Sequence, residues 1–289
     1  MATSAHSKLV IMLDLHTHSS ASDGTLSPKE LVQLAKKIKL RAVGLCDHDT
    51  TGGLDEAMRT ARQIDQLLIP GVELSANCRR TTVHIVGLCI HHECEPLQRL
   101  LEQTRRMRDE RNPRIIAALQ QEGIDISMDD VTQLAVGNAV GRPHFAAALI
   151  QKGVVKTAVQ AFDTYLGANG RAYVARERLD AKDAIQIIRT AGGVPILAHP
   201  HQTGLAEDAL LKLVGQMKEQ GLLGIEVFCS GYTSSMSAQY TRVARRHGLV
   251  RSGGSDFHGA AKPNIRLGRG IGNLYVRDDL LEPILALAK

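Results

Sequence analysis

The sequence contains no tryptophan, and aromatic residues of all kinds make up only 3% of its 289 residues. A core with so few rings must be filled by aliphatic side chains, which are the side chains that fill the interior of α/β barrels. Few rings are available to stack on nucleic-acid bases; the options are Tyr165, Tyr173, Tyr232 and Phe257. The length is sufficient for one large domain or two small ones.

Cysteine is scarce and shows no pairing pattern. The five cysteines are an odd number, and no two have the CxxC spacing. Long hydrophobic runs are also absent: near the N-terminus the longest is Leu9 to Leu13, too short for a signal peptide or a membrane span. These absences predict a cytoplasmic protein without disulfides or a membrane partner, and no obligatory protein partner is evident. Residues 1–8 are expected to be a disordered lead-in.

Two well-known motifs of nucleotide and ester chemistry are absent. There is no GxxxxGK[ST] loop, which excludes ATP hydrolysis by that route, and no GxSxG elbow for a nucleophilic serine. The net charge is +5. This charge fits either a mildly basic soluble protein or a protein with an anionic substrate such as a phosphate ester, and charge alone does not separate the two.

Short apolar runs alternate with amphipathic segments along most of the chain. Ser27 and Glu30 form a capping box around Pro28, which predicts a helix beginning there. The alternation is typical of a barrel-like parallel sheet covered by helices. We predict an α/β fold, an irregular (β/α)7 TIM-like barrel, with strands at 10–15, 42–46, 67–72, 82–88, 194–198, 224–228 and 249–254, and further helices at 53–65, 180–191, 207–219 and 235–247.

Residues 99–168 interrupt this alternation and have no strand pattern. An arginine-rich helix is predicted at 100–122, followed by shorter helical segments near 128–134, 142–150 and 157–166. An insertion of this size after a barrel strand can cover the active face as a lid. We therefore predict an all-helical lid domain at 99–168, between barrel segments at 9–98 and 169–289.

Histidine and carboxylate residues follow or lie within the predicted strands, beside Gly, Ser or Pro. The ends of barrel strands meet at one face, so these side chains converge in space. His16 and His18 are one residue apart and point to the same side of a strand. The simpler alternatives to metal binding are that Glu73 is a surface carboxylate and that His84 is a core histidine with hydrogen-bond partners. Histidine and carboxylate ligands suit Zn, Mn or Fe. The segments that carry the candidate ligands are DLHTH at 14–18, SDG at 22–24, DHD at 47–49, GVE at 71–73, His84, His199 and GSDFH at 254–258.

Together these motifs resemble the PHP (polymerase and histidinol phosphatase) family of amidohydrolase-like metal hydrolases. The matching stretches are DLHTHS at 14–19, SDGT at 22–25, CDHDT at 46–50, GVELS at 71–75, VHIVG at 83–87, LAHP at 197–200 and GGSDFHG at 253–259. The resemblance extends from about residue 12 to the end of the chain. Within the insertion, GRPHFA at 141–146 is similar to family members that act as nucleoside 3′,5′-bisphosphate phosphatases.

The resemblance implies two to three divalent metal ions, with Mn expected first and Zn or Fe as alternatives. It assigns His16, His18, Glu73 and Asp256 to one ion, with Asp256 also catalytic. It assigns Glu73, His84 and His199 to a second ion, and Asp23, His48 and His258 to a third. Close cations suit a phosphate group because they neutralise its charge and generate hydroxide near neutral pH.

Several other residues are candidates for binding phosphate, for transferring a proton or for orienting the metal ligands. Arg142 is the best candidate for binding and stabilising phosphate, and His144 either assists it or only packs. Arg108, Arg111 and Arg114 recur every three residues and form either a phosphate-binding stripe or a solvated face. His201 is a candidate to protonate the leaving oxygen or to bind phosphate. Asp14, Asp47 and Asp49 could orient the imidazoles, and Asp49 could equally cap the next helix.

The implied activity is metal-dependent removal of the 3′-phosphate from nucleoside 3′,5′-bisphosphates, by attack of a metal-activated hydroxide on phosphorus. The partner would be a small nucleotide, with short RNA as a second option. Alternatives are 5′-3′ exonuclease action on short RNA or DNA, and hydrolysis of histidinol phosphate, whose small cationic substrate needs no second phosphate site. A non-catalytic nucleic-acid module would not be expected to keep a complete set of ligands.

Overall fold

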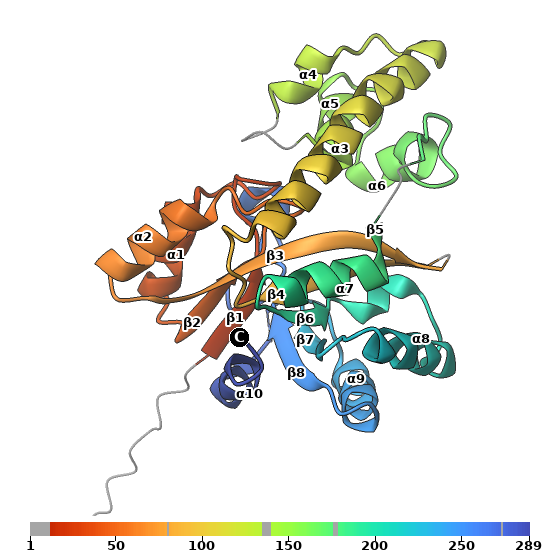
Figure 1. Cartoon of the computed structure of the whole chain (residues 1–289). Helices are drawn as coiled ribbons and strands as arrows, with labels where there is room; N and C mark the ends of the chain where they lie inside the picture. The colour runs from red at the N-terminus through yellow and green to blue at the C-terminus, as the bar shows by residue number, and fades with distance from the viewer. Residues whose placement is uncertain (1–11, 80, 135–139, 176–178, 273) are drawn as a thin grey trace, which may run out of the picture.

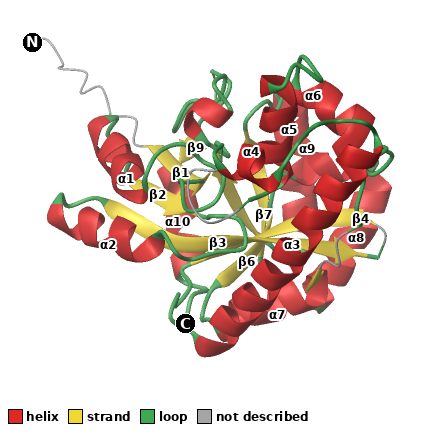
Figure 2. Cartoon of the chain, turned by 90° about the horizontal axis from the view of Figure 1, so that it is seen from above, coloured by secondary structure: helices red, strands yellow, loops and turns green. Residues whose placement is uncertain are grey.

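The computed structural model describes residues 12–79, 81–134, 140–175, 179–272 and 274–289, so the expected lead-in at 1–8 lies outside the described residues. Within this part of the chain, nine strands form one sheet, in the order β8-β7-β6-β4-β3-β2-β1-β9, with β5 paired to β3. The sheet curls into a nearly closed barrel surrounded by helices (Figures 1 and 2). No helix of the described residues has the length and apolar character needed to cross a membrane.

The strands confirm the predicted α/β barrel and correct its details. They are β1 (Met12–Thr17), β2 (Ala42–Leu45), β3 (Leu67–Cys78), β4 (Thr81–Leu88), β5 (Leu179–Asp180), β6 (Val194–Leu197), β7 (Gly224–Cys229), β8 (Val250–Gly254) and β9 (Val276–Arg277). The strands β5 and β9 were not predicted, because two residues carry no periodicity. The prediction of an all-parallel sheet is wrong, since β4 runs antiparallel to both β3 and β6.

The barrel closes between β1 and the segment after β8 through backbone contacts. Asp256 N donates to His16 O at 2.9 Å, and His18 N donates to Phe257 O at 2.9 Å. These bonds place the end of β1 directly beside the residues that follow β8. The closure therefore brings the first and last ligand motifs of the chain together.

The barrel helices form close to where the sequence predicts them, except α10 (Leu281–Leu285), which was not predicted. Ser27 Oγ accepts from Glu30 N, and Glu30 Oε2 accepts from Ser27 N, which completes the expected capping box. Each helix packs a mostly aliphatic face on the barrel, as the lack of aromatic residues requires. The helices are α1 (Pro28–Lys37), α2 (Leu54–Gln63), α7 (Ala181–Thr190), α8 (Glu207–Glu219), α9 (Ser234–Arg246) and α10 (Leu281–Leu285).

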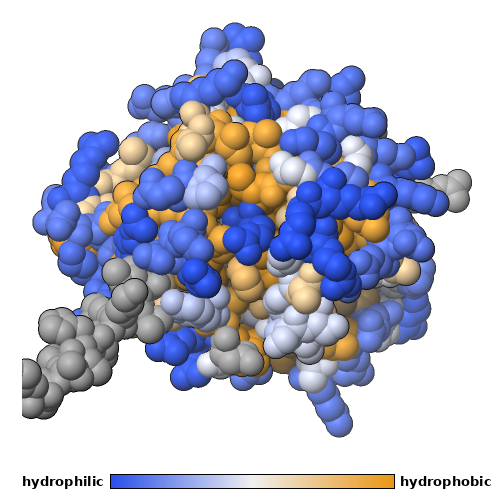
Figure 3. Space-filling view, turned by 90° about the horizontal axis from the view of Figure 1, so that it is seen from below, coloured by the Kyte–Doolittle hydropathy of each residue, from blue (hydrophilic) through white to orange (hydrophobic). Residues whose placement is uncertain are grey.

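The end of the barrel at which the parallel strands begin is filled by apolar side chains. Leu13, Ala42, Val194 and Ile284 belong to one buried cluster that joins the strand starts to α10. In the view from below, where α10 lies in Figure 1, apolar residues appear within a hydrophilic surround (Figure 3). This packing leaves the opposite end of the barrel as the place where polar residues gather.

The segment between β4 and β5 is helical and has its own apolar cluster. Its elements are α3 (Glu95–Gln121), α4 (Met128–Thr132), α5 (Arg142–Gln151), α6 (Ala158–Ala161) and a π-helix (Phe162–Leu166), and its described residues contain no strand. Leu97 and Leu101 of α3 pack in the barrel core, whereas Ile115 and Leu119 pack in the separate cluster with Phe145. The predicted boundary at residue 99 therefore falls inside α3, and the lid role remains a prediction.

Replacing Gly254 with Ala is expected to destabilise the barrel closure. A Cβ added at Gly254 would lie 2.4 Å from both the backbone nitrogen and the Cβ of His16. Overpacking of this kind typically costs about 1–3 kcal/mol, and urea unfolding measures the loss. Gly52→Ala is the matched control, because its nearest neighbour would be Thr50 Oγ1 at 3.4 Å. Equal stability of the two variants would contradict the tight contact between β8 and β1.

Candidate metal centre

The nine predicted metal ligands lie together at one end of the barrel. His16 lies near the end of β1, and His18 directly follows this strand. Glu73 lies in the middle of β3, and His84 lies in β4. The prediction that the third strand stops at Glu73 is wrong, because β3 continues to Cys78. Within the described chain, three overlapping groups of side chains are close enough to hold metal ions: His16, His18, Glu73 and Asp256; His18, Asp23, His48 and His258; and His48, Glu73 and His84.

The first group consists of buried side chains from the end of β1, from β3 and from the segment after β8. His16 Nε2 and His18 Nε2 lie 3.1 Å apart, and they lie 3.3 and 3.2 Å from Glu73 Oε2. Asp256 Oδ1 lies 3.3 Å from His18 Nε2. Two imidazole nitrogens facing each other and two carboxylates suit a shared divalent cation.

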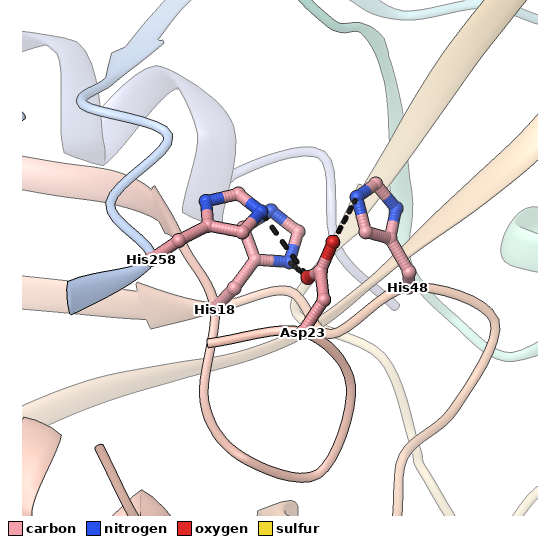
Figure 4. Close-up of side chains that lie close together, drawn as sticks. All are labelled: His18, Asp23, His48 and His258. Carbon is pink, nitrogen blue, oxygen red and sulfur yellow. Dashed lines mark ion pairs between the residues drawn. The ribbon is translucent and has the colours of Figure 1, made fainter. Parts of the chain in front are cut away.

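The second group extends the site toward solvent, and Figure 4 shows its four side chains facing one another. Asp23 Oδ1 lies 3.2 Å from His258 Nε2, and Asp23 Oδ2 lies 3.8 Å from His48 Nε2. His18 Nδ1 lies 3.9 Å from Asp23 Oδ1. The ring of His18 thus offers Nε2 to the first group and Nδ1 to the second, a sharing that the sequence analysis did not predict.

Glu73 lies at the junction of the groups. Its Oε1 is 2.8 Å from His84 Nδ1 and 2.9 Å from His199 Nε2. Its Oε2 is 3.0 Å from His48 Nδ1. The family resemblance implied that His84 and His199 join this carboxylate, whereas the compact group contains His48 instead of His199. The sharing of Glu73 between two ions remains a prediction.

The cluster contains buried polar atoms that a cation would satisfy. Four buried atoms have no partner with hydrogen-bond geometry among the described residues, although some lie within ion-pair distance of one another or of Asp23; they are His18 Nδ1, His48 Nδ1, Glu73 Oε2 and His258 Nε2. A buried polar atom without a partner costs roughly 1–3 kcal/mol. Four such atoms facing one space therefore fit metal ions better than they fit a purely structural cluster.

Metal binding needs neutral imidazoles and ionised carboxylates, and the cluster meets this requirement only in part. Burial, together with the charges of His258 and His48, lowers the pKa of His18 to about 4. Burial alone would raise the pKa of Glu73, but His48, His16 and His84 outweigh burial and hold that pKa well below its ordinary value. Glu73 is therefore ionised and His18 neutral near pH 7.

Burial lowers the pKa of His48, but Glu73 and Asp23 outweigh burial and raise that pKa to about 9. Glu226 and Glu73 likewise outweigh burial at His16 and raise its pKa well above the ordinary value, so a metal ion must displace protons from these two rings.

Glu226 is a buried carboxylate in contact with two predicted ligand residues, and it was not selected from the sequence. It is buried in β7, where its Oε1 lies 2.8 Å from His16 Nδ1 and its Oε2 accepts from His199 N at 2.7 Å. A proton on His16 Nδ1 leaves Nε2 free to face the cluster. The available signal was a carboxylate inside an otherwise apolar strand, because such a residue is rarely buried without a partner.

Asp14 and Asp47 support loops instead of orienting imidazoles. Asp14 accepts from Ser255 N and Oγ at 2.8 and 2.6 Å, and from Gly268 N at 2.7 Å. Asp47 accepts from Ser19 N and Oγ at 2.8 and 2.7 Å, and from Ser22 Oγ at 2.6 Å. The predicted role of these two carboxylates is therefore corrected: they hold the loops that carry the ligands.

Asp49 does not cap the next helix. The N-cap of α2 is Gly53, and no side chain caps this helix. Asp49 Oδ1 accepts from Ser75 N at 3.2 Å, so it ties the loop after β2 to β3.

The candidate phosphate-binding residues of the helical segment differ in their contacts and in their exposure to solvent. Arg142 Nη1 donates to Leu166 O at 3.0 Å, and Gly141 N donates to His144 Nδ1 at 3.0 Å. Arg111 is only 6% exposed, whereas Arg114 is exposed, so these two do not form an exposed stripe. The side chain of Arg108 lies outside the described residues.

His201 lies at the rim of the ligand cluster. Its ring centroid is 6.3 Å from that of His199, and its Nδ1 is 3.3 Å from Tyr232 Oη. The side chain is exposed, so a substrate can reach it from solvent.

Removing bound metal with EDTA is expected to lower the melting temperature. Without cations, the carboxylates and imidazoles of the cluster keep buried polar atoms without partners. A ligand that binds only the native state adds about 2.7 kcal/mol at about 100 times its Kd. Circular dichroism melts before EDTA, after EDTA and after addition of Mn test this expectation. A melting temperature that EDTA leaves unchanged would count against a metal centre.

The comparisons with known proteins agree with this geometry. A model of the PHP domain matches residues 14–189. A 5′-3′ exoribonuclease of Haemophilus influenzae is 39% identical over 245 residues, which cover 85% of this chain and 89% of that protein. A 3′,5′-nucleoside bisphosphate phosphatase of Chromobacterium violaceum is 33% identical over 273 residues, which cover 94% of each chain.

A solved structure described as a metal-dependent phosphoesterase, from Bifidobacterium adolescentis, has the same fold. It superposes with a TM-score of 0.85 and 32% sequence identity, over 96% of each chain. The family match covers more than half of the sequence, and the structural match includes both barrel and insertion. The chain therefore belongs to the PHP-domain family, as a metal-dependent phosphoesterase.

Proposed function

We propose that the protein removes the 3′-phosphate from nucleoside 3′,5′-bisphosphates and leaves the nucleoside 5′-monophosphate. The observation that carries this proposal is the junction at Glu73, where both carboxylate oxygens face imidazoles of overlapping groups. A site that can hold neighbouring cations suits the charge of a phosphate monoester. The similarity to the bisphosphate phosphatase of Chromobacterium violaceum supports the choice of substrate.

The proposed metal ligands are the nine side chains predicted from the sequence, held as divalent ions with Mn expected first. Bound metal would supply charge neutralisation for the phosphate and a lowered pKa for water. His16, His18 and Glu73, fully buried, exclude water from the inner side. His201, exposed at the rim, is proposed to hold or deliver a proton near the leaving oxygen.

The arginines of the helical segment are proposed to bind the second phosphate of the substrate. Arg142 begins α5 and is half-buried, and its guanidinium can bind two phosphate oxygens at once. His144 lies two residues after Arg142, and Arg111 lies in α3; both are buried. They are proposed to assist phosphate binding, and Arg108 and Arg114 are further candidates. This role requires the helical segment to act as a lid.

Exonuclease action on short RNA is a second candidate, because the similar protein of Haemophilus influenzae is a 5′-3′ exoribonuclease. Both reactions hydrolyse a phosphoester beside a 5′-phosphate. The two candidates differ in the length of substrate accepted. We also propose a cytoplasmic location, which the five free cysteines support.

Phosphate release from adenosine 3′,5′-bisphosphate, with Mn supplied, tests the proposal. Release of one phosphate with 5′-AMP as the remaining product is expected, and 5′-AMP and histidinol phosphate are expected to be inert. A 5′-phosphorylated oligoribonucleotide, followed by gel electrophoresis, tests the second candidate. Release from histidinol phosphate, or cleavage of the oligonucleotide with an inert bisphosphate, would reject the proposed substrate.

A further inference from the structure

Lys262 brings a positive charge to the edge of the ligand cluster. Its Nζ lies 2.7 Å from Asp256 Oδ2, and a lysine side chain is a cation at neutral pH. Lys262 lies outside the sequence motifs, three positions after the last of them. Its contact with a proposed metal ligand requires an explanation.

The two oxygens of Asp256 face in different directions. Asp256 Oδ1 lies 3.3 Å from His18 Nε2 and 3.8 Å from His16 Nε2, on the inner side of the cluster. Asp256 Oδ2 faces Lys262. The ion pair therefore leaves the oxygen that faces the first group free, and a cation in that group can coexist with the lysine.

Lys262 lies on the solvent side of the cluster. Its side chain is 40% exposed, whereas that of Asp256 is 11% exposed and those of His16 and His18 are fully buried. An ion pair that is this open to solvent contributes little to the stability of a fold. A molecule that approaches the inner ligands from solvent near Asp256 meets the ammonium group.

The backbone that carries Lys262 is held in place by the loop that carries Asp23. Thr25 N donates to His258 O at 3.1 Å, and Thr25 Oγ1 accepts from Ala260 N at 2.8 Å. The short turn Gly259–Ala261 then leads directly into Lys262. The ammonium is thus positioned by the same loops as the metal ligands.

We propose that Lys262 binds a phosphate oxygen of the substrate from the solvent side while the inner side of the phosphate faces the metal ligands. An ammonium group has three N–H donors, so Lys262 can keep Asp256 and still donate to phosphate. A charge-assisted bond of this kind is among the stronger hydrogen bonds of proteins. The inference rests on the proposed hydrolysis of phosphate monoesters at this cluster, but not on the identity of the nucleotide.

Binding of inorganic phosphate to the Mn-loaded protein, measured by isothermal titration calorimetry, tests the proposal. Lys262→Met is expected to weaken phosphate binding by about tenfold or more, the effect of losing one charged hydrogen bond, with unchanged metal content by emission spectrometry. Lys262→Arg is expected to keep most of the affinity. Lys212→Met, which removes an exposed lysine of α8, is the control and should match the unaltered protein.

Two results would overturn the proposal. Lys262→Met could bind phosphate as tightly as the control, or it could lose metal, in which case Lys262 serves to position Asp256. An inert adenosine 3′,5′-bisphosphate would reject the proposed nucleotide substrate, yet calorimetry with phosphate would still decide the role of Lys262.

Discussion

Replacing Glu73 with Gln is expected to abolish metal-dependent hydrolysis and to lower the content of bound metal. Glu73 is fully buried and contacts His16, His18, His48, His84 and His199 through its two oxygens. The amide removes the negative charge and presents a donor where cations are expected. Loss of several kcal/mol of charge stabilisation corresponds to a fall in kcat/KM of about a thousandfold or more.

The matched control for this variant is Glu207→Gln. Glu207 pairs with Arg242 at 3.1 Å on the surface, where its side chain is 41% exposed, so its loss is expected to leave kcat/KM and metal content unchanged. Circular dichroism checks that both variants are folded. A Glu73→Gln protein that keeps its metal and most of its activity would reject the bridging position assigned to this carboxylate.

Replacing Glu226 with Gln is expected to weaken metal binding while leaving all nine proposed ligands in place. The carboxylate faces two groups that need acceptors, His16 Nδ1 and His199 N. A glutamine offers one acceptor oxygen and one donor nitrogen, so one of the two contacts becomes a clash of donors. Loss of a partner that orients a metal ligand typically reduces metal affinity or activity by about 10–100-fold.

Titration with Mn separates the effect of Glu226→Gln on metal affinity from the loss of activity expected for Glu73→Gln. Activity of Glu226→Gln is expected to recover at high Mn concentration, because the ligands themselves remain, whereas Glu73→Gln is expected to stay inactive. Glu226→Asp keeps two acceptor oxygens on a shorter side chain and should fall between the two. A Glu226→Gln protein with unaltered Mn affinity would show that this residue only packs.

The residues of the site could be predicted from the sequence because their spacing carries structural information. His16 and His18 are placed on one side of β1 by the two-residue period of a strand. Asp256 and His258 follow the strand predicted at 249–254, so their position after β8 was predictable as well. The grouping of these ligands could not be predicted, because it depends on the direction of each ring. His18, for example, faces one group with each nitrogen.

The antiparallel direction of β4 was the main feature of the fold that was not predicted from the sequence. Cys78 pairs with Thr81, so a two-residue connection joins β3 to β4. Such turns usually contain Gly or Asn, but here the first position is Arg79, with a φ of 57°. Without the usual turn residues, the two strands look like separate units of a parallel barrel.

Glu226 and Lys262 were missed for a different reason. Neither lies in a recognisable motif, and each contacts the cluster through a residue that is distant in the chain or across a turn. Glu226 is 210 residues from His16 in sequence. Only the closure of the barrel brings the two side chains together.

The central claim is that the cluster is a metal centre that hydrolyses phosphate esters. The most direct test is to strip the protein of metal, add Mn stepwise, and follow bound metal and phosphate release from adenosine 3′,5′-bisphosphate in the same samples. We predict no release from stripped protein, and release that rises with bound Mn as the three overlapping groups are filled. Full activity of stripped protein, or Mn binding without any hydrolysis, would contradict the claim.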